Sequence, residues 1–561
     1  MYIINVIPLI KIPFPNPQVL SYFFSKKLFK GSLVRISIRK KQINAIVLSS
    51  ENLEKRKIEI KKSAVFKLRP IEKIISEKPI LTKKQLKLLL WFSKYYFSPL
   101  GTTTRLFISR KLIMAKKPLN NYPMPAINKI RLILTPETKK LVFAPFNNLK
   151  SIIIENEDSS KYISWGRRPY YDTRKIAVQL ARIFKAKITL KSKLPSTETR
   201  YWARKKKYKL IIQNLKSRIQ NSEIIDMREE IKSGNFSIIS QELQKKLRES
   251  RKSVLFISRR GTATFILCRD CGHVIKCPDC DAPLVLHRIS NKLICHHCGK
   301  EEKPPAFCPN CKGYRIKYFG AGTQKVEVEI KKLFPKIEIF RLDSDIVKTP
   351  EQQQEIIKKF NIAAGKADKL KKSILIGTQM LIEKNIKPVN LVGIISIDAI
   401  LNLPDYRSSE RIFKILNQLQ LISKKEFIVQ TYNPENFAIR SAVDNKLKCF
   451  YNKEIENRKV LEYPPFSQII KLSFEHKNQK KVEDEVKILF EKLKQQAKNF
   501  QLSISNFQLL GPVPAFIPRV KGKYRWNIII KSKAKNLKSR NKFLIIVPST
   551  WSIEVDPKSL L

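Results

Sequence analysis

Eight of the nine cysteines form four Cys-x-x-Cys pairs, and this run is the clearest chemical signal in the sequence. The pairs are Cys268/Cys271, Cys277/Cys280, Cys295/Cys298 and Cys308/Cys311. Two residues between cysteines let one tight turn present both sulfurs to an ion, and two such turns complete a tetrahedral site with Zn–S bonds of about 2.3 Å. Because a Cys₄ site leaves no open coordination position, the pairs predict two structural zinc ions and not a catalytic one.

The spacing does not fix which pairs share an ion. The segments on both sides of the run have the pattern of one α/β unit, so the chain must leave and re-enter one sheet, which favours a nested arrangement. One zinc is then held by Cys268, Cys271, Cys308 and Cys311, and the other by Cys277, Cys280, Cys295 and Cys298. Four complete pairs make the nearby histidines redundant as ligands, namely His273, His287, His296 and His297. Cys449 stands alone and is expected to be an ordinary core residue.

The charge balance points to a polyanionic partner. The chain has 111 Lys and Arg against 47 Asp and Glu, a net charge of +64 and a pI near 10.1. Such a charge repels itself unless a polyanion neutralises it, and nucleic acid is the usual one. An AT-rich genome would also enrich Lys, Ile and Asn, and we assign about half of the excess to that bias. Charge alone therefore indicates a polyanion without naming it.

No segment has the pattern of a membrane helix or a targeting signal. The apolar start Met1–Ile10 is interrupted by Pro8 and is far shorter than the roughly 20 apolar residues that a spanning helix needs. We therefore expect a cytoplasmic, nucleoid-associated protein without a membrane partner. Clustered cysteines in a reducing compartment bind metal instead of forming disulfides.

At 561 residues the chain is too long for a single core, and its pattern predicts an α/β multidomain fold. A helix is expected at Lys83–Tyr95 and another at Thr173–Phe184, with apolar strands such as Ile152–Ile154 and Ser253–Ile257. The expected units are a β-rich domain at 1–108, a linker at 109–128, a short α/β unit at 129–212, an α/β unit at 213–435 that contains the cysteine module 268–311, and an α+β unit at 436–561.

Further motifs flank the cysteine module. Ser258-Arg259-Arg260-Gly261 precedes it and Gly320-Ala321-Gly322-Thr323 follows it. Later come Ile376-Gly377-Thr378-Gln379-Met380, Asp405-Tyr406-Arg407-Ser408-Ser409-Glu410-Arg411, Tyr463-Pro464-Pro465-Phe466, Lys523-Tyr524-Arg525-Trp526 and Val555-Asp556-Pro557. With these motifs the sequence resembles the PriA family, primosomal protein N′ of bacterial replication restart. The resemblance is weak over 1–108 and clear over about 129–561.

The resemblance implies a superfamily 2 DNA helicase architecture. Its parts are an N-terminal domain like the family's 3′-DNA-binding domain, a truncated RecA-like lobe 1, a RecA-like lobe 2 with an inserted two-zinc module, and an α+β C-terminal domain. It also implies partners, which are forked or single-stranded DNA, primosome proteins and single-stranded DNA-binding protein.

The sequence departs from the family at the ATPase. A P-loop needs Gly-x-x-x-x-Gly-Lys-[Ser/Thr], whose backbone amides and lysine hold the phosphates. The Gly-Lys pairs here are followed by Glu301, Ala367 and Tyr524, and none has a glycine five positions earlier. The N-terminal domain also leads straight into the latter half of lobe 1, so the family's winged helix and first helicase motif are expected to be deleted.

The other ATPase elements are altered as well. The family's acidic box after an apolar strand corresponds to Glu155-Asn156-Glu157-Asp158, where the second carboxylate is replaced by Asn156. The Ser-Ala-Thr-Pro element corresponds to Ser192-Lys193-Leu194-Pro195, and the arginine-finger element near Asn417–Ile422 has no arginine. Loss of a finger alone costs about 10³-fold or more in rate. We therefore expect no ATP binding, no catalytic residue and no helicase activity.

The candidate DNA-binding residues come from two places. Arginines interleaved with tyrosines suit bases stacked on rings and phosphates held by cations. The segment after the acidic box has this pattern and resembles the family's aromatic-rich loop; the residues concerned are Arg167, Arg168, Tyr170, Tyr171 and Arg174. A solvated basic turn is the alternative. In the N-terminal domain the resemblance points to Gly31 and Arg69, whereas the family's aromatic–acidic pair is Leu20-Ser21 here.

The predicted function is that of a replication restart protein that binds forked or single-stranded DNA and supports primosome assembly. Three alternatives remain open: an active ATP-dependent 3′→5′ helicase, a generic zinc-ribbon nucleic-acid binder, and the product of an eroding gene.

Overall fold

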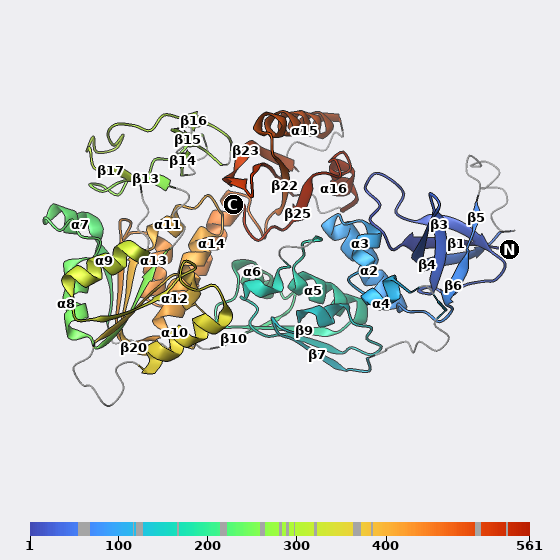
Figure 1. The fold of residues 1–561 in the computed structure, drawn as a ribbon, viewed down its shortest axis with the longest axis horizontal. Helices are drawn as coiled ribbons and strands as arrows, with labels where there is room; N and C mark the ends of the chain where they lie inside the picture. The colour runs from blue at the N-terminus through green and yellow to red at the C-terminus, as the bar shows by residue number, and fades with distance from the viewer. Residues whose placement is uncertain are drawn as a thin grey trace.

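The computed structural model shows a mixed α/β multidomain protein (Figure 1), and its described residues form five sheets. It describes residues 1–53, 68–115, 117–118, 127–164, 168–213, 221–258, 264–279, 283–287, 291–296, 298–318, 323–362, 372–382, 385–499, 507–533 and 537–561.

The first sheet has the strand order β5-β2-β1-β4-β3-β6. Its strands are β1 (Tyr2–Pro8), β2 (Leu20–Phe24), β3 (Leu33–Ile38), β4 (Lys41–Asn52), β5 (Arg69–Pro70) and β6 (Lys73–Ser76). Helices α2 (Lys83–Tyr96), α3 (Leu100–Thr104) and α4 (Arg110–Ile113) follow. The predicted helix at Lys83–Tyr95 is confirmed as α2, which begins with a capping box between Thr82 and Gln85.

The segment expected to be a linker begins with a packed helix. Leu112 of α4 is buried, and the side chains of Arg35 and Asn44 donate to the carbonyl of Ala115. Residues 110–115 therefore pack against the first sheet instead of connecting two units freely. Residues 119–126 lie outside the described part of the chain.

The second sheet is parallel and has the order β10-β9-β8-β7. Its strands are β7 (Arg131–Leu134), β8 (Ser151–Ile154), β9 (Lys187–Ser192) and β10 (Lys209–Ile212). Helices α5 (Thr173–Phe184) and α6 (Thr197–Arg204) lie on one face of it (Figure 1), and short 3₁₀ turns occupy Lys139–Phe143 and Ser160–Tyr162. Helix α5 has the predicted bounds. Parallel strands place their carboxyl ends at one edge, and the acidic residues after β8 lie there.

The third sheet is also parallel, with the order β11-β21-β20-β12-β19-β18. Its strands are β11 (Asn221–Asp226), β12 (Lys252–Ile257), β18 (Glu338–Leu342), β19 (Ser373–Gly377), β20 (Val389–Ser396) and β21 (Ser423–Thr431). Its helices are α7 (Met227–Lys232), α8 (Gln241–Glu249), α9 (Thr323–Leu333), α10 (Pro350–Ile362), α11 (Asp398–Leu401), α12 (Ser408–Gln420), α13 (Phe437–Val443) and α14 (Leu447–Val460), with a 3₁₀ turn at Gln379–Leu381. Strand β19 is buried along its whole length, as expected for a parallel sheet covered on both faces.

Two helices belong to this unit although the sequence placed them in the C-terminal one. The apolar side chains of α13 and α14 join the core of the third sheet; Phe450, for example, stacks on Phe413 of α12 with ring centroids 3.9 Å apart. The expected core position of Cys449 is wrong, because this residue lies on the exposed side of α14.

The cysteine module leaves the third sheet after β12 and forms a small sheet, β16-β15-β14-β13-β17. Its strands are β13 (Thr264–Cys268), β14 (Val285–His287), β15 (Lys292–Ile294), β16 (Glu301–Glu302) and β17 (Ile316–Tyr318). The C-terminal sheet is antiparallel with the order β23-β24-β22-β25. Its elements are β22 (Gln468–His476), α15 (Gln479–Asn499), β23 (Phe507–Val520), β24 (Lys523–Ser532), α16 (Leu537–Leu544) and β25 (Ser552–Val555).

One hydrophobic core runs through three of these units. It includes side chains of α2, of the second sheet with α5, and of the C-terminal sheet. Helix α2 lies between the other two, and its Phe92 is fully buried. The N-terminal domain is thus joined to the rest by packing. Among helices of described residues, none combines the length and hydropathy needed to cross a bilayer.

Candidate functional site

The four outer cysteines lie together at one end of the module. Cys268 ends β13, and the ligand atoms of Cys268, Cys271, Cys308 and Cys311 all lie within 4.8 Å of one another. Sγ of Cys268 is 3.6 Å from that of Cys311, and Sγ of Cys271 is 3.7 Å from that of Cys308. A tetrahedron with Zn–S bonds of about 2.3 Å has edges of about 3.8 Å. The donor set therefore fits one zinc ion.

The backbone around these cysteines forms two knuckles. In one, the amide of Gly272 donates to the carbonyl of Cys268, and in the other the amide of Lys312 donates to that of Cys308. Burial raises the pKa of the Cys268 thiol to about 12. Burial also raises the pKa of Cys271, but the Asn310 amide and neighbouring groups lower it to about 7. Cys271 is thus the more readily deprotonated of the two, and a thiolate is the form that binds zinc.

The inner cysteines form a second group. The ligand atoms of Cys277, Cys295 and Cys298 lie within 4.8 Å of one another, and Sγ of Cys277 is 3.6 Å from that of Cys298. Cys280 lies outside the described residues. The seven described cysteines of the module therefore group as outer and inner sets, the grouping of a nested arrangement. The clusters are consistent with zinc, and the full ligand sets stay a prediction.

The two groups dock on different neighbours. At the outer group, Gly272 has φ +74°, and a Cβ on it would lie 2.5 Å from the carbonyl oxygen of Tyr432 after β21. Arg269 Nε donates to the hydroxyl of Tyr432 at 3.2 Å. At the inner group, Nδ1 of His296 is 2.9 Å from the carbonyl oxygen of Pro514 on β23, and its ring lies edge-on to Phe516. The module thus bridges the third sheet and the C-terminal sheet, and no sequence pattern indicated the contact of His296.

A cavity of about 450 Å³ lies where the second sheet meets the third and the C-terminal segment. Charged residues of both parallel-sheet units line it, including Glu157, Glu198, Arg407, Glu410 and Lys414. This is the carboxyl edge of the second sheet, where open α/β sheets bind their ligands.

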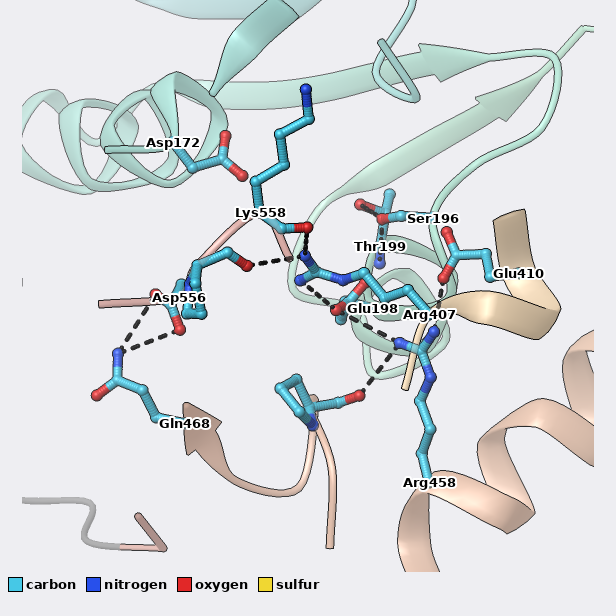
Figure 2. A network of polar contacts seen from close by, with 12 residues as sticks. Asp172, Ser196, Glu198, Thr199, Arg407, Glu410, Arg458, Gln468, Asp556 and Lys558 are labelled. Atoms are coloured by element: carbon cyan, nitrogen blue, oxygen red, sulfur yellow. Dashed lines mark hydrogen bonds and ion pairs between the residues drawn. The ribbon is translucent and has the colours of Figure 1, made fainter. Parts of the chain in front are cut away.

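A buried ion network spans this boundary, and Figure 2 shows Glu198, Arg407, Glu410 and Arg458 pointing toward one another. Glu198 of α6 is 3.2 Å from Nη2 of Arg407 and 3.4 Å from Nη1 of Arg458. The side chain of Arg458, on α14, is 2% exposed and also contacts Glu410 and Glu454, each at 2.7 Å. Burial raises the pKa of Glu410, but Lys414 and Arg458 hold it well below its ordinary value. Burial raises the pKa of Glu454 instead, and each carboxylate of the network lies within ion-pair distance of an arginine.

Arg407 also reaches the end of the chain. Its Nη1 donates to the carbonyl oxygens of Pro557 and Lys558, at 3.0 and 3.1 Å (Figure 2). One arginine thus ties the second sheet, the third sheet and the C-terminal segment together. Sequence motifs included Arg407 and Glu410 but did not indicate this pairing.

The carboxylates after β8 have structural partners. Glu155 forms an ion pair with Lys191 at 2.9 Å, and Asn156 turns the chain with φ +49°. Glu157 is fully buried and accepts from the amide of Ser196 at 3.1 Å and from the hydroxyl of Thr199 at 2.6 Å. Its carboxylate therefore sits at the N-terminus of α6, where the helix dipole stabilises negative charge.

Two of the predicted DNA-binding residues after the acidic box are occupied by internal contacts. Tyr171 is 7% exposed and packs edge-on against Phe92 and Phe143, so no face of its ring is open to a base. Arg174 donates to both carboxylate oxygens of Asp172 and to the backbone carbonyl of Glu157. The expectation that Tyr171 stacks on DNA is therefore wrong, because the ring fills the core beneath α2.

The other residues of this segment differ. Tyr170 is partly exposed, and Arg168 is exposed while its Nη1 donates to the carbonyl of Trp551 at 3.1 Å. Arg167 lies outside the described residues. The structure thus leaves Arg168 and Tyr170 accessible on the surface.

The two N-terminal candidates lie in different settings. Gly31 has φ +92°, and a Cβ there would lie 2.2 Å from the carbonyl oxygen of Leu81, so the fold itself requires glycine. Arg69 is exposed at the start of β5 and pairs in register with Tyr22. Ser21, next to Tyr22, is exposed and donates to Oδ1 of Asn5 at 2.7 Å. Arg69 therefore lies on the edge strand β5, and Ser21 lies on the neighbouring strand β2.

Three family models match the chain. The 3′DNA-binding domain matches residues 9–109, the Cys-rich region of PriA DNA helicase matches residues 277–303, and the primosomal protein N C-terminal domain matches residues 459–558. Each match falls on one of the sheets described above, outside the two parallel ones.

Curated relatives match a longer part. Replication restart protein PriA of Borreliella burgdorferi is 36% identical over 442 residues, which cover 75% of this chain and 64% of the relative. That of Bacillus subtilis is 34% identical, over 72% of this chain and 50% of the relative. That of Rickettsia prowazekii is 32% identical over 77% of this chain and 67% of the relative. The chain belongs to the PriA family. It spans about half to two thirds of the length of these PriA relatives.

Proposed function

We propose that this PriA-family chain binds forked or single-stranded DNA, supports primosome assembly at replication restart, and does not unwind DNA with an ATPase of its own. The observation that carries the proposal is the ion network around Glu198 at the carboxyl edge of the second sheet. A RecA-like motor needs two lobes that move about a nucleotide at this edge. Here Glu198, Arg407 and Arg458 join the two parallel-sheet units directly.

The sequence supports the same proposal. It has no Gly-x-x-x-x-Gly-Lys-[Ser/Thr] segment to hold phosphates. Glu157, the buried carboxylate after β8, lines the cavity, but its carboxylate oxygens already accept hydrogen bonds from the amide of Ser196 and the hydroxyl of Thr199 at the start of α6. We therefore assign the two parallel-sheet units a scaffolding role, as a truncated lobe 1 and a lobe 2.

The DNA-binding part of the proposal rests on the N-terminal domain. This domain matches a 3′DNA-binding domain, and Arg69 on β5 and Ser21 on β2 are exposed there. A serine hydroxyl there can still hydrogen bond to a terminal nucleotide, although it carries no charge. The zinc module, held between the third sheet and the C-terminal sheet, is the proposed contact for primosome proteins and for single-stranded DNA-binding protein.

The test measures DNA binding and ATP hydrolysis together on the zinc-loaded full chain. Fluorescence anisotropy at one salt concentration compares a fork, a single strand, plain duplex and RNA. We expect the fork and the single strand to bind at least about 10-fold more tightly than duplex or RNA. Equal affinities with equally steep salt slopes would indicate a generic polycation and contradict the proposal.

The ATPase arm separates the proposal from an active helicase. We expect DNA to stimulate no hydrolysis above background. DNA-stimulated ATP hydrolysis that Glu155→Gln abolishes would overturn the proposal. The variant removes the first carboxylate after β8 of this chain and would leave the activity of a contaminating ATPase unchanged. For the N-terminal domain, Arg69→Ala is expected to weaken fork binding about 3-fold or more. Arg39→Ala, in the turn between β3 and β4, serves as the matched exposed control.

A further inference from the structure

The second sheet has helices on one face only among the described residues. Helices α5 and α6 cover one side, and Figure 1 shows no helix on the other. On the covered side, Leu132, Ile152 and Leu190 point into the core shared with α5. Since side chains alternate along a strand, the residues between them point to the opposite face.

That opposite face combines isoleucines with cations, and we call it the bare face. It consists of Arg131 and Ile133 from β7, Ser151 and Ile153 from β8, Lys187, Thr189 and Lys191 from β9, and Lys209 and Ile211 from β10. Ile133 is 48% exposed and Ile211 is 37% exposed. By register, Ile133, Ile153, Thr189 and Lys209 form one row across all four strands.

A parallel sheet with an uncovered face is unusual. Such sheets occur almost only with both faces covered by helices, because their strands are apolar on both sides. In this sheet Ile133 and Ile211 are the apolar residues left exposed, whereas β-branched apolar residues on a sheet are normally packed against a covering element. The bare face therefore has the composition of a surface that is covered in the working state.

The charges on the bare face define what covers it. Arg131, Lys187 and Lys209 are exposed. The carboxylate at its edge, Glu155, is already paired with Lys191. A complementary surface must therefore bring its own acidic groups, placed around an apolar centre.

We propose that the bare face binds an amphipathic helix of another protein, with Asp and Glu flanking an apolar stripe. Four strands about 4.8 Å apart span roughly 15 to 19 Å, which a helix of about 10 to 13 residues matches. The apolar stripe packs on Ile133, Ile153 and Ile211, and the acidic flanks pair with the surrounding cations.

Two other occupants fit less well. Nucleic acid would leave its phosphates over the isoleucine row, and the described residues of this face include no aromatic ring on which a base could stack. A second copy of the chain would bring together two molecules that each carry a net charge of +64. This inference does not depend on the proposed DNA binding.

The experiment titrates the full chain into a fluorescein-labelled peptide of about 14 residues. The peptide carries leucines at helical positions i, i+3, i+4, i+7 and i+11 and glutamates beside them; a scrambled peptide of the same composition is the control. We expect saturable binding of the helical peptide and at least about 10-fold weaker binding of the scrambled one. Equal binding of the two peptides, or none, would overturn the proposal.

Variants locate the site. The double variant Ile133→Ser and Ile211→Ser is expected to weaken peptide binding at least about 10-fold without changing fork binding. Ile488→Ser on α15, where the isoleucine is 52% exposed, is the matched control and should bind as the parent chain does. An undiminished affinity in the double variant contradicts the proposal. A fork affinity that falls together with the peptide affinity also contradicts the proposal, because it assigns the face to nucleic acid. A dimer in sedimentation that the double variant abolishes contradicts it as well, because it assigns the face to a second copy of the chain.

Discussion

Arg407 donates to Glu198 across the boundary between the two parallel sheets, with 3.2 Å between Nη2 and Oε1. The two residues lie 209 positions apart in sequence. Arg458 approaches the same carboxylate at 3.4 Å and is almost completely buried. A buried charge that loses its partner is strongly destabilising, so this contact fixes how the two units sit against each other.

Glu198→Gln should loosen this boundary. The variant keeps the shape of the side chain but leaves Arg407 and Arg458 with less opposing charge. We expect the free energy of unfolding to fall by about 2 kcal/mol. This is less than the loss of a full buried pair would cost, because Glu410 and Glu454 still contact Arg458. Amide hydrogen exchange of α6 and α14 should then quicken roughly 30-fold. The control is Glu456→Gln, because Glu456 pairs with the exposed Lys453. Loss of this exposed pair should change the free energy of local opening, as measured by hydrogen exchange, by less than about 0.5 kcal/mol. Equal effects of the two variants would show that the boundary pair carries no special weight.

Elements with a strong local pattern were predictable from sequence. Helix α5 has the predicted bounds because its apolar residues repeat at helical spacing and Asp172 caps it. The cysteine pairs were also readable, since a Cys-x-x-Cys turn carries its chemistry within four residues. In both cases the information that sets the structure is local.

Tertiary partners were not predictable. Tyr171 in an Arg/Tyr-rich segment has the composition of a DNA-binding loop, but its exposure depends on Phe92 and Phe143, which come from other elements. Ile133 is the opposite case. An apolar residue in a strand is expected to be buried, but Ile133 is exposed and no described residue covers it. Cys449 is exposed because α14 turns its other side, with Phe450, toward the core.

Gly31→Ala tests whether the fold alone requires this glycine. The new Cβ would lie 2.2 Å from the carbonyl oxygen of Leu81, and φ +92° is unfavourable for alanine. We expect a loss of more than about 3 kcal/mol, since backbone strain and a clash with main-chain atoms add. Thermal unfolding followed by circular dichroism measures it.

Gly234→Ala separates strain from clash. Gly234 has a similar φ of +87°, but apart from its chain neighbours no atom of the described residues lies within 4 Å of the added Cβ. This variant should cost only about 1 to 2 kcal/mol. If Gly31→Ala is as stable as Gly234→Ala, the close approach to Leu81 does not constrain the chain.

Replacement of one cysteine should remove one zinc. Cys268→Ser breaks the outer group and Cys277→Ser breaks the inner one, so zinc per chain should fall from two to about one in each variant. Metal analysis by mass spectrometry after dialysis measures the ratio. Cys449→Ser is the control because this cysteine is exposed on α14, far along the chain from both groups, and should keep both ions. Two zinc ions retained in Cys268→Ser would refute the outer ligand set.

The inner variant should also free the C-terminal sheet from the module. His296 follows Cys295 directly, and its contact with Pro514 depends on the knuckle that the inner cysteines shape. Hydrogen exchange in β23 should therefore rise in Cys277→Ser and not in Cys268→Ser. An equal rise in both would show that the two groups fold as one unit.

Asp398 should make the stability of the third sheet fall as pH rises. This carboxyl is 1% exposed; its Oδ1 accepts from the hydroxyl of Thr431 and the amide of Tyr432, while Oδ2 has no hydrogen-bond partner among the described residues. Burial raises its pKa to about 6, and nearby Asp226 acts in the same direction. The folded chain thus holds a proton that the unfolded chain releases near pH 4, so the stabilisation is complete below about pH 4 and is lost as pH rises through 6. Between pH 5 and 7 the loss of stability is on the order of 1 kcal/mol.

Asp398→Asn removes this titrating carboxyl. As the pH rises from 5 to 7, the urea midpoint of the parent chain should therefore fall relative to that of the variant. Asp444→Asn, at a more exposed position, should run parallel to the parent chain at every pH, and an Asp398→Asn curve that also stays parallel would exclude a titration at this site.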